Sequence, residues 1–346
     1  MSKLSSRKQL KKGASPVNKD VFGERESFKP FNYPWAYDTW LEHEQMHWIS
    51  REVPLHEDVR DWNNRLSAED VKFLTDVFLL FTQSDIDVAN GYIRDYLPHF
   101  KQPEIRMMLL GFAAREATHI DAYSYLIETL GKPDSFYSEF LNVPVMREKH
   151  KFFEKVVNNS RKKEALPIQI AGISAFTEGM FLFSSFVMLL NYPRNGLMKG
   201  MGQIITWSIL DEQKHVEGLT RLFRTIISEN SQWWTDAAKS EIYATAELMT
   251  ELEYDFIDHV YGGRSEIHGL ASDDLKQYIR YIVDRRLIAL GMKGIHKVKV
   301  NPLGWVDEMI ASQNHENFFE SRATSYAKGA LKGSWGDVWG KYDANK

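Results

Sequence analysis

Glu116-Ala117-Thr118-His119 and Glu212-Gln213-Lys214-His215 are two copies of one pattern, Glu-x-x-His, and they decide the expected fold. Both copies lie in stretches whose hydrophobic residues recur with the period of an α-helix. A spacing of three residues places the Glu and the His on one face of the helix, about 4.5 Å apart along its axis. Each pair can therefore hold one metal ion, and two such helices facing each other would hold two.

Two further carboxylates are needed to complete such a site, one from each of the other two helices of a bundle. Asp85 and Glu178 are the candidates, because each is an acid near the middle of a long helical stretch. Four carboxylates and two neutral imidazoles around two divalent ions leave no net charge. The predicted metal ligands are Asp85, Glu116, His119, Glu178, Glu212 and His215.

Helical periodicity dominates the chain, and the alternation that is typical of strands is almost absent. Four long helices are expected, each with its ligands near the middle, at 67–97, 103–131, 167–193 and 197–229. A shorter helix is expected at 34–48, and three or four more should follow residue 229 up to about residue 291. We therefore predict an all-α protein with a ferritin-like four-helix bundle core and additional helices.

A third copy of the pattern, Glu44-Gln45-Met46-His47, shows that Glu-x-x-His alone is weak evidence for a metal site. This copy lies on a short aromatic helix without a matching partner, and we assign it to chance. The other two copies differ, because apolar residues flank Glu116 and Glu212 and should bury both helices. Burying an unpaired carboxylate costs several kcal/mol, and a bound cation is the usual remedy.

The composition limits the kind of metal site and the kind of partner. The chain has no cysteine, so its metal ligands must be carboxylate, imidazole and water, which suit iron or manganese. A pair of iron ions is expected, and a Mn/Fe or Mn/Mn pair is left open. The net charge of -4 gives no reason to expect nucleic acid or an anionic membrane as a partner, and a cytoplasmic location is expected.

The chain is expected to have three parts. Residues 1–25 carry several Lys and Arg residues among Ser, Gly, Asn and Pro, and we expect them to form a flexible basic arm. Nothing in 26–310 resembles an interdomain linker, so this range is treated as one helical di-metal domain. Residues 311–346 become rich in glycine and read as a flexible tail. Glu178 is the one charge between Glu164 and Arg194, a span long enough to cross a bilayer, but its polar residues favour a buried central helix.

The ligand motifs together resemble those of the radical-generating small subunit of class I ribonucleotide reductase. The motifs that carry the resemblance are Ser84-Asp85, Glu116-x-x-His119, Thr177-Glu178-Gly179 and Asp211-Glu212-x-x-His215. The resemblance covers roughly residues 30 to 326. It implies that the protein works as a homodimer, joined to a separate catalytic large subunit.

The resemblance also implies roles for four residues outside the ligand set. Tyr123, one turn after His119, matches the radical tyrosine of the family, and Trp48 matches its relay tryptophan. Asp211 matches the acid that links a metal-bound histidine, here His119, to that indole. Tyr326 matches the tail tyrosine that passes the radical to the large subunit, with Tyr342 as the alternative.

The implied function is that of a small subunit of ribonucleoside-diphosphate reductase. Its dinuclear metal site would activate oxygen and generate a radical for deoxyribonucleotide synthesis in the large subunit. The oxidising equivalent would rest on Tyr123 or on a high-valent metal pair, a choice left open because Ser208, Leu182 and Leu210 depart from the family pattern. A flavoprotein activase is a further candidate partner. The alternatives are a ferritin-like di-metal oxygenase or oxidase, and an iron-storage protein.

Overall fold

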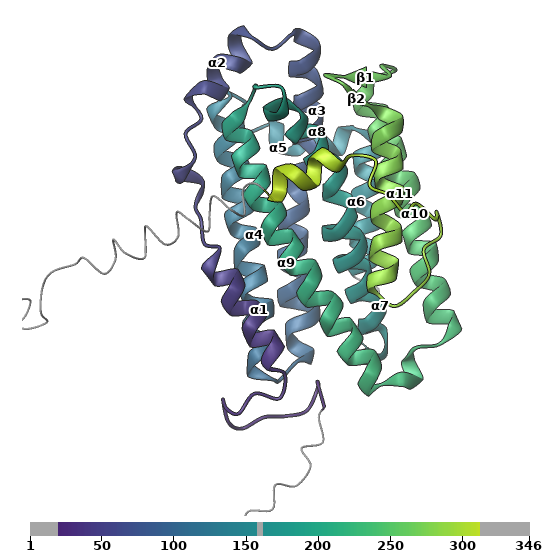
Figure 1. The fold of residues 1–346 in the computed structure, drawn as a ribbon. Coiled ribbons are helices and arrows are strands. Elements are labelled where there is room, and N and C mark those ends of the chain that lie inside the picture. Colours follow the sequence, from purple (N-terminus) through teal and green to yellow (C-terminus); the bar gives the residue numbers. More distant parts are fainter. Residues whose placement is uncertain (1–19, 158–161, 312–346) are drawn as a thin grey trace, which may run out of the picture.

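The structure, a computed structural model, describes residues 20–157 and 162–311. Its long helices run side by side in Figure 1, with α1 along one flank and α10 and α11 along the other. The predicted N-terminal arm up to residue 19 and the predicted tail from residue 312, with Tyr326 and Tyr342, lie outside the described residues. The α-helices are α1 (Pro34–Gln45), α2 (His56–Asn64), α3 (Ala68–Gly91), α4 (Pro103–Thr129), α5 (Phe136–Glu139), α6 (Pro144–Val157), α7 (Leu166–Ala171), α8 (Leu182–Arg194), α9 (Lys199–Glu229), α10 (Asp236–Tyr261) and α11 (Ser272–Ala289).

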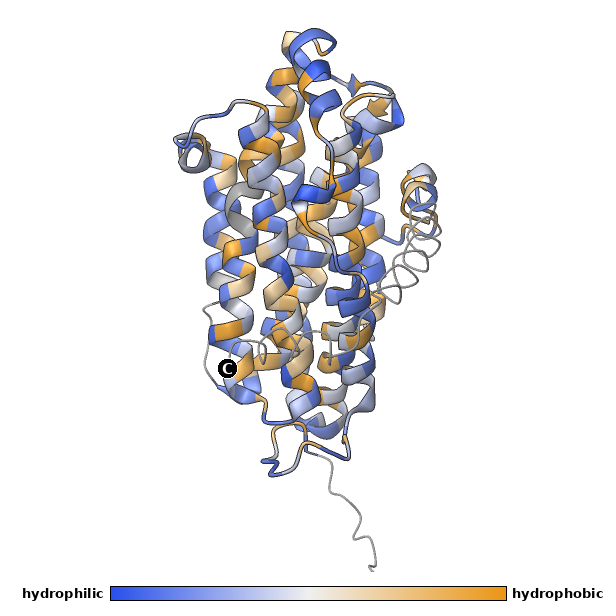
Figure 2. Cartoon of the chain, turned by 90° about the vertical axis from the view of Figure 1, so that its left-hand side faces the viewer, coloured by the Kyte–Doolittle hydropathy of each residue, from blue (hydrophilic) through white to orange (hydrophobic). Residues whose placement is uncertain are grey.

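The four expected long helices are present and form the core of the fold. They are α3, α4, α9 and a continuous run from α7 to α8, and α3 packs against α4 while α8 packs against α9. Figure 2 shows hydrophilic and hydrophobic residues along the helices that face the viewer, as expected for helices that bury one face. The all-α bundle is therefore confirmed.

The start of α3 follows the expected capping pattern. The Ser67 hydroxyl accepts a hydrogen bond from the Asp70 amide at 3.1 Å, and the Asp70 carboxylate accepts one from the Ser67 amide at 3.1 Å. This reciprocal capping box satisfies two amides that the helix cannot pair internally. Asp70 also accepts hydrogen bonds from Tyr192 of α8 and from His268, so it joins three segments of the chain.

The helix that carries Glu178 is not a regular α-helix. Its middle, Gly172–Phe181 (η6), is π-helical, and each of its residues is buried. A side chain at Gly179 would place its Cβ 2.6 Å from the Ser174 carbonyl oxygen and 2.7 Å from Nε of Arg286, so only glycine fits beside Glu178. The segment 163–194 is long and apolar enough to span a bilayer, yet its most apolar window is entirely inside the molecule. The predicted buried central helix is confirmed.

The structure differs from the expected element bounds at two places. The first helix ends at Gln45, before Trp48. Trp48 lies between α1 and a 3-10 turn at Ser50–Glu52 (η1), and its indole points inward to its hydrogen-bond partner on α9. Between residues 229 and 291, where three or four helices were expected, the described residues hold two long α-helices, α10 and α11, and one short 3-10 helix at Ser231–Trp233 (η7). α10 runs unbroken until Gly262, whose φ of 58° ends the helix. A hairpin of two short strands, β1 (Glu266–Ile267) and β2 (Leu270–Ala271), then leads into α11.

A buried ion pair lies on the side of the bundle that α6 and α10 cover. Nζ of Lys149 contacts the carboxylate of Glu253, and the Ser184 hydroxyl donates a hydrogen bond to the same carboxylate. The lysine and glutamate side chains are completely buried, and the Lys149 ammonium lies 3.8 Å from the ring centroid of Phe181. This pair fixes α6 and α10 against the end of the π-helical segment.

Candidate metal centre

All six predicted ligands converge in the middle of the bundle. Each is at most 1% exposed. They come from four different helical segments: Asp85 from α3, Glu116 and His119 from α4, Glu178 from η6, and Glu212 and His215 from α9. Donor atoms of these side chains form two groups in which each atom lies within 4.8 Å of the others. The structure therefore assembles the predicted set without exception.

One half of the site surrounds the imidazole of His119. Nδ1 of His119 lies 3.2 Å from Oε1 of Glu212, 3.4 Å from Oε2 of Glu116 and 3.8 Å from Oδ2 of Asp85. These three carboxylates come from three different helices. Together with the imidazole they offer oxygen and nitrogen donors of the kind that bind iron or manganese.

The other half surrounds the imidazole of His215 in the same way. Nδ1 of His215 lies 3.1 Å from Oε1 of Glu116, 3.3 Å from Oε2 of Glu212 and 3.8 Å from Oε1 of Glu178. The two halves therefore share two carboxylates, since Glu116 and Glu212 each turn one oxygen toward each imidazole. This sharing makes the cluster suitable for two metal ions rather than one.

The buried donor atoms fit a metal pair because several of them have no hydrogen-bond partner in the described part of the chain. Within the described residues, Oε1 of Glu116, both carboxylate oxygens of Glu212 and Nδ1 of each histidine make no hydrogen bond of ordinary geometry. Buried polar atoms are normally paired, so a cluster of such atoms needs an explanation. Two cations at this place would supply the missing partners and balance the charge of the carboxylates.

The pKa shifts of the ligand side chains show the same excess of negative charge. Burial raises the pKa of Glu178 well above its usual range. Burial alone would lower the pKa of His215, but the carboxylates of Glu116 and Glu212 outweigh it and raise this pKa to about 10. Both shifts favour the binding of positive charge by the crowded carboxylates. The hydroxyl of Tyr92, which sequence reasoning missed, donates a 2.6 Å hydrogen bond to Oε1 of Glu178 and holds that carboxylate in place.

Tyr123 lies beside the first half of the site. Its ring centroid is 6.2 Å from that of His119, and its side chain is 5% exposed. Burial raises the pKa of the phenol well above its usual value, and a hydrogen-bonding contact with Ser208 opposes that rise. A small apolar cavity adjoins the ring, lined by Phe78, Tyr123, Leu126, Ile127, Leu189 and Ile205. Tyr123 is therefore shielded from water, and Ser208 provides a polar contact within this apolar surrounding.

Asp211 connects the site to Trp48. The indole Nε1 of Trp48 donates a 2.8 Å hydrogen bond to Oδ2 of Asp211, and Nε2 of His119 lies 3.1 Å from the same oxygen. Since Nδ1 of His119 faces the carboxylates, its Nε2 carries the proton that this contact requires. Burial alone would raise the pKa of Asp211, but the contacts with His119 and His43 hold it well below its usual range.

Two further residues beside Asp211 were missed from the sequence. Nε2 of His43 lies 3.5 Å from Oδ1 of Asp211 and 3.3 Å from Nε2 of His215, and burial lowers the pKa of this imidazole to about 4. Arg115 lies 3.7 Å from Oδ2 of Asp211 and donates a hydrogen bond to the His43 carbonyl. Arg115 could have been suspected, because it directly precedes Glu116. The third Glu-x-x-His copy is a chance match, since Glu44 and His47 are both exposed.

Comparison with known proteins agrees with this geometry. A family model described as "Ribonucleotide reductase, small chain" matches residues 25–302. A probable ribonucleoside-diphosphate reductase small subunit of Invertebrate iridescent virus 6 is 43% identical, over 92% of this chain and 98% of the viral protein. The ribonucleoside-diphosphate reductase subunit beta of Chlamydia pneumoniae is 30% identical, over 86% and 88% of the two chains.

Solved structures support the fold. The R2 subunit of ribonucleotide reductase from Clostridium botulinum superposes with a TM-score of 0.77 at 21% identity, and covers 83% of this chain and 91% of that chain. The structure of a dimanganese(II) protein from Streptococcus sanguinis superposes with a TM-score of 0.69 at 19% identity, and covers 81% and 96%. At such identities the likeness concerns the arrangement of the helices.

Proposed function

The chain belongs to the ribonucleotide reductase small-chain family, and we propose that its six buried ligands hold two metal ions that generate the radical used in ribonucleotide reduction. The chain is accordingly a small subunit of ribonucleoside-diphosphate reductase. The observation that carries the metal proposal is the sharing of Glu116 and Glu212 between the imidazoles of His119 and His215.

Each metal would have its own imidazole and its own terminal carboxylate. His119 and Asp85 would bind the first metal, and His215 and Glu178 the second, with Glu116 and Glu212 shared between them. A pair of iron ions is proposed, and Mn/Fe and Mn/Mn pairs would use the same donors. The donor set thus accounts for a dinuclear cofactor without a thiolate.

The chemistry of the chain itself begins at Tyr123. Bound metals would supply the oxidising equivalent by reaction with oxygen. The ring centroid of Tyr123 lies 6.2 Å from that of His119, so its phenol is an oxidisable group beside the first half of the site. Loss of one electron and the phenolic proton would leave a neutral tyrosyl radical in an apolar pocket. The Asp85 carboxylate, whose charge acts on the phenol, is available to take that proton, and Ser208 can form a hydrogen bond to the radical.

Radical transfer out of the site would use the hydrogen-bonded path through Asp211. The Asp211 carboxylate accepts the indole proton of Trp48 when that indole loses an electron toward His119 and the metals. From Trp48 the radical would pass to Tyr326 in the C-terminal tail, with Tyr342 as the alternative. The final acceptor is proposed to be a cysteine of the large subunit, since this chain has none.

The partners follow from the family. Small subunits of this family are dimeric and work with a large catalytic subunit, and we propose a homodimer of this chain as the working form. A flavoprotein activase is proposed as an accessory for cofactor assembly. The cytoplasm is the proposed location, with neither nucleic acid nor a membrane as a partner.

An oxygenase or an iron-storage protein would need the same ligands but not the link from His119 to Trp48.

Reconstitution with the large subunit tests which of these functions the chain has. The iron-loaded chain and its large subunit together should reduce ribonucleoside diphosphates, whereas either protein alone should not. Glu116→Gln should abolish the activity, and Glu128→Gln, an exposed change on the same helix, should preserve it. Failure of the loaded pair, or full activity of Glu116→Gln, would contradict the proposal.

A further inference from the structure

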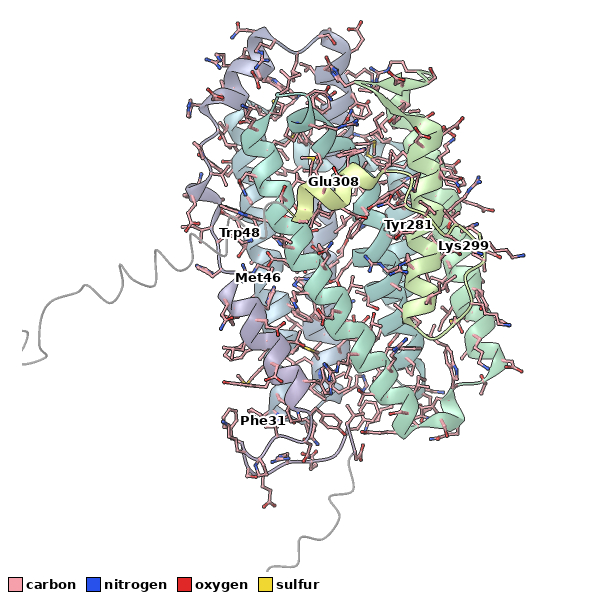
Figure 3. All side chains as sticks on the ribbon, in the orientation of Figure 1. Phe31, Met46, Trp48, Tyr281, Lys299 and Glu308 are labelled. Carbon is pink, nitrogen blue, oxygen red and sulfur yellow. The ribbon has the colours of Figure 1, made fainter. Side chains whose placement is uncertain are left out.

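Trp48 contacts a second tryptophan on its outer side. Its ring centroid lies 5.2 Å from that of Trp207, and the two ring planes are inclined by 48°. Trp207 is on α9, one turn before Asp211, so the same helix positions Trp207 and Asp211 beside the Trp48 indole. In Figure 3, Trp48 lies just beyond the end of α1, on the flank of the molecule.

The two tryptophans differ in their access to water. Trp48 is 4% exposed, whereas Trp207 is half-buried and reaches the surface. Within the described residues Trp48 makes two ring contacts, one inward with His119 at 6.0 Å between centroids and one outward with Trp207. The rings of His119, Trp48 and Trp207 therefore form a series of contacts that leads from the metal site to the surface.

We propose that Trp207 is a redox partner of Trp48 and the point at which electrons enter or leave the buried site at the surface of the helical domain. The inference rests on the proposed function, because it requires Trp48 to be oxidised. Two indoles have similar oxidation potentials, so an electron can pass between them with little change in free energy. Contact between the rings makes that exchange fast.

The transfer balances as a single electron step. When Trp48 has lost one electron inward and its Nε1 proton to Asp211, Trp207 gives one electron to Trp48. The proton returns from Asp211 to Nε1 of Trp48, which restores the intact indole and the carboxylate. Trp207, now short of one electron, releases its own Nε1 proton to water. A one-electron reductant in solution can then restore Trp207.

The alternative is that Trp207 only fills space beside Trp48. A radical trap separates the two roles. Trp207 is replaced by 5-hydroxytryptophan, which is oxidised more easily than tryptophan, in the full-length chain loaded with iron. The sample is exposed to oxygen, frozen at intervals and examined by electron paramagnetic resonance. We expect a radical on residue 207 that disappears when Trp48 is changed to Phe. The same trap at Trp234, which is also half-buried but packs on Phe223, should give no radical.

The outcomes keep the inference apart from the proposed function. Oxidation of Tyr123 or of the metals without a radical at residue 207 would overturn the inference alone, as would a residue-207 radical that persists in Trp48→Phe. Absence of any oxidised species in the loaded chain would overturn both.

A second measurement needs no unnatural residue. Ferrocyanide, a one-electron reductant that is charged and cannot enter the apolar bundle, is added to the oxidised protein, and decay of the oxidised site is followed by absorbance. Trp207→Phe should slow the decay at least tenfold, whereas Trp234→Phe should leave it unchanged. An unchanged rate in a folded, metal-loaded Trp207→Phe protein would overturn the inference.

Discussion

The indole nitrogen of Trp48 donates a 2.8 Å hydrogen bond to Oδ2 of Asp211, although 163 residues separate them in the sequence. The same oxygen accepts from Nε2 of His119 at 3.1 Å. One carboxylate oxygen therefore joins a candidate metal ligand on α4 to an indole near the surface. A buried link of this kind serves proton-coupled electron transfer better than it serves stability, because burying the charged Asp211 is costly.

Replacing Asp211 by Asn tests the charge of this link. The amide oxygen can still accept both hydrogen bonds, but it cannot take up the indole proton of Trp48. We expect nucleotide reduction with the large subunit to fall by about 10–100-fold, while Tyr123 oxidation persists. The matched control is Asp121→Asn. Asp121 is exposed, and its carboxylate accepts a hydrogen bond from Ser50, close to Trp48 in the sequence. Equal activity of the two variants would count against the path through Asp211.

The shared carboxylates predict an unequal effect of the ligands on metal content. Glu116 faces both imidazoles, so Glu116→Gln should reduce the loading of both metals. Asp85 belongs to the group of donors around His119, and Asp85→Asn should lower the affinity of one metal and spare the other. Metal analysis after dialysis, with calorimetric titration of the apoprotein, measures both. Loss of both metals from Asp85→Asn, with retention of one by Glu116→Gln, would reverse the assignment.

The buried pair of Lys149 and Glu253 predicts a coupled effect on stability. Lys149→Met leaves the Glu253 carboxylate buried without its cation, and the free energy of unfolding should fall by about 3–5 kcal/mol. Adding Glu253→Gln removes the unpaired charge and keeps an acceptor for Ser184, so the double variant should regain most of that loss. Urea denaturation of the metal-free proteins measures the difference. A double variant less stable than Lys149→Met would disprove the coupling.

Asp70 predicts a stability difference that depends on pH. Burial tends to raise the pKa of its carboxyl group, but hydrogen bonds from Ser67 and the contact with His268 outweigh burial and lower it. A carboxylate whose pKa is lower in the folded state stabilises the fold above its unfolded pKa, and this contribution disappears as the pH falls through the folded pKa. Asp70→Asn should therefore cost about 1–3 kcal/mol near pH 7.

The cost of Asp70→Asn should shrink below about pH 4, where the unfolded carboxyl is protonated. Urea denaturation at several pH values measures it. Glu69→Gln, an exposed change in the same helical turn, should alter stability by at most about 0.5 kcal/mol at each pH. A cost for Asp70→Asn that stays constant from pH 7 to pH 3 would contradict this role.

The six ligands could be predicted because their signal is local. Glu116 and His119 are fixed relative to each other by one helical turn, and so are Glu212 and His215, while Asp85 and Glu178 stand out as acids in apolar helices. The residues that sequence reasoning missed lack such a pattern. His43 and Tyr92 reach their partners through contacts that span 172 and 86 residues, which depend on how whole helices pack.

The irregular backbone around Glu178 and Trp48 could not be predicted from local sequence patterns either. Periodicity predicts a helix through Glu178, but the π-helical turns from Gly172 to Phe181 depend on packing against α9 and α11, where Arg286 donates a hydrogen bond to the Gly179 carbonyl. Trp48 was placed at the end of a helix, although its contact with Asp211 turns the chain out of helical form. The roles of Tyr123, Trp48, Asp211 and Tyr326 stay predictions, because they concern transfer of an electron.

Electron paramagnetic resonance of the metal-loaded chain after exposure to oxygen tests the central claim most directly. The account predicts a paramagnetic product, either a tyrosyl radical or a stable high-valent metal pair, that Glu116→Gln cannot form. If the signal is a tyrosyl radical, Tyr123→Phe should abolish it with the metal content unchanged, and survival of activity in that variant would place the oxidising equivalent on the metals. A fully loaded chain that forms neither a tyrosyl radical nor a stable high-valent metal pair in oxygen would contradict the account.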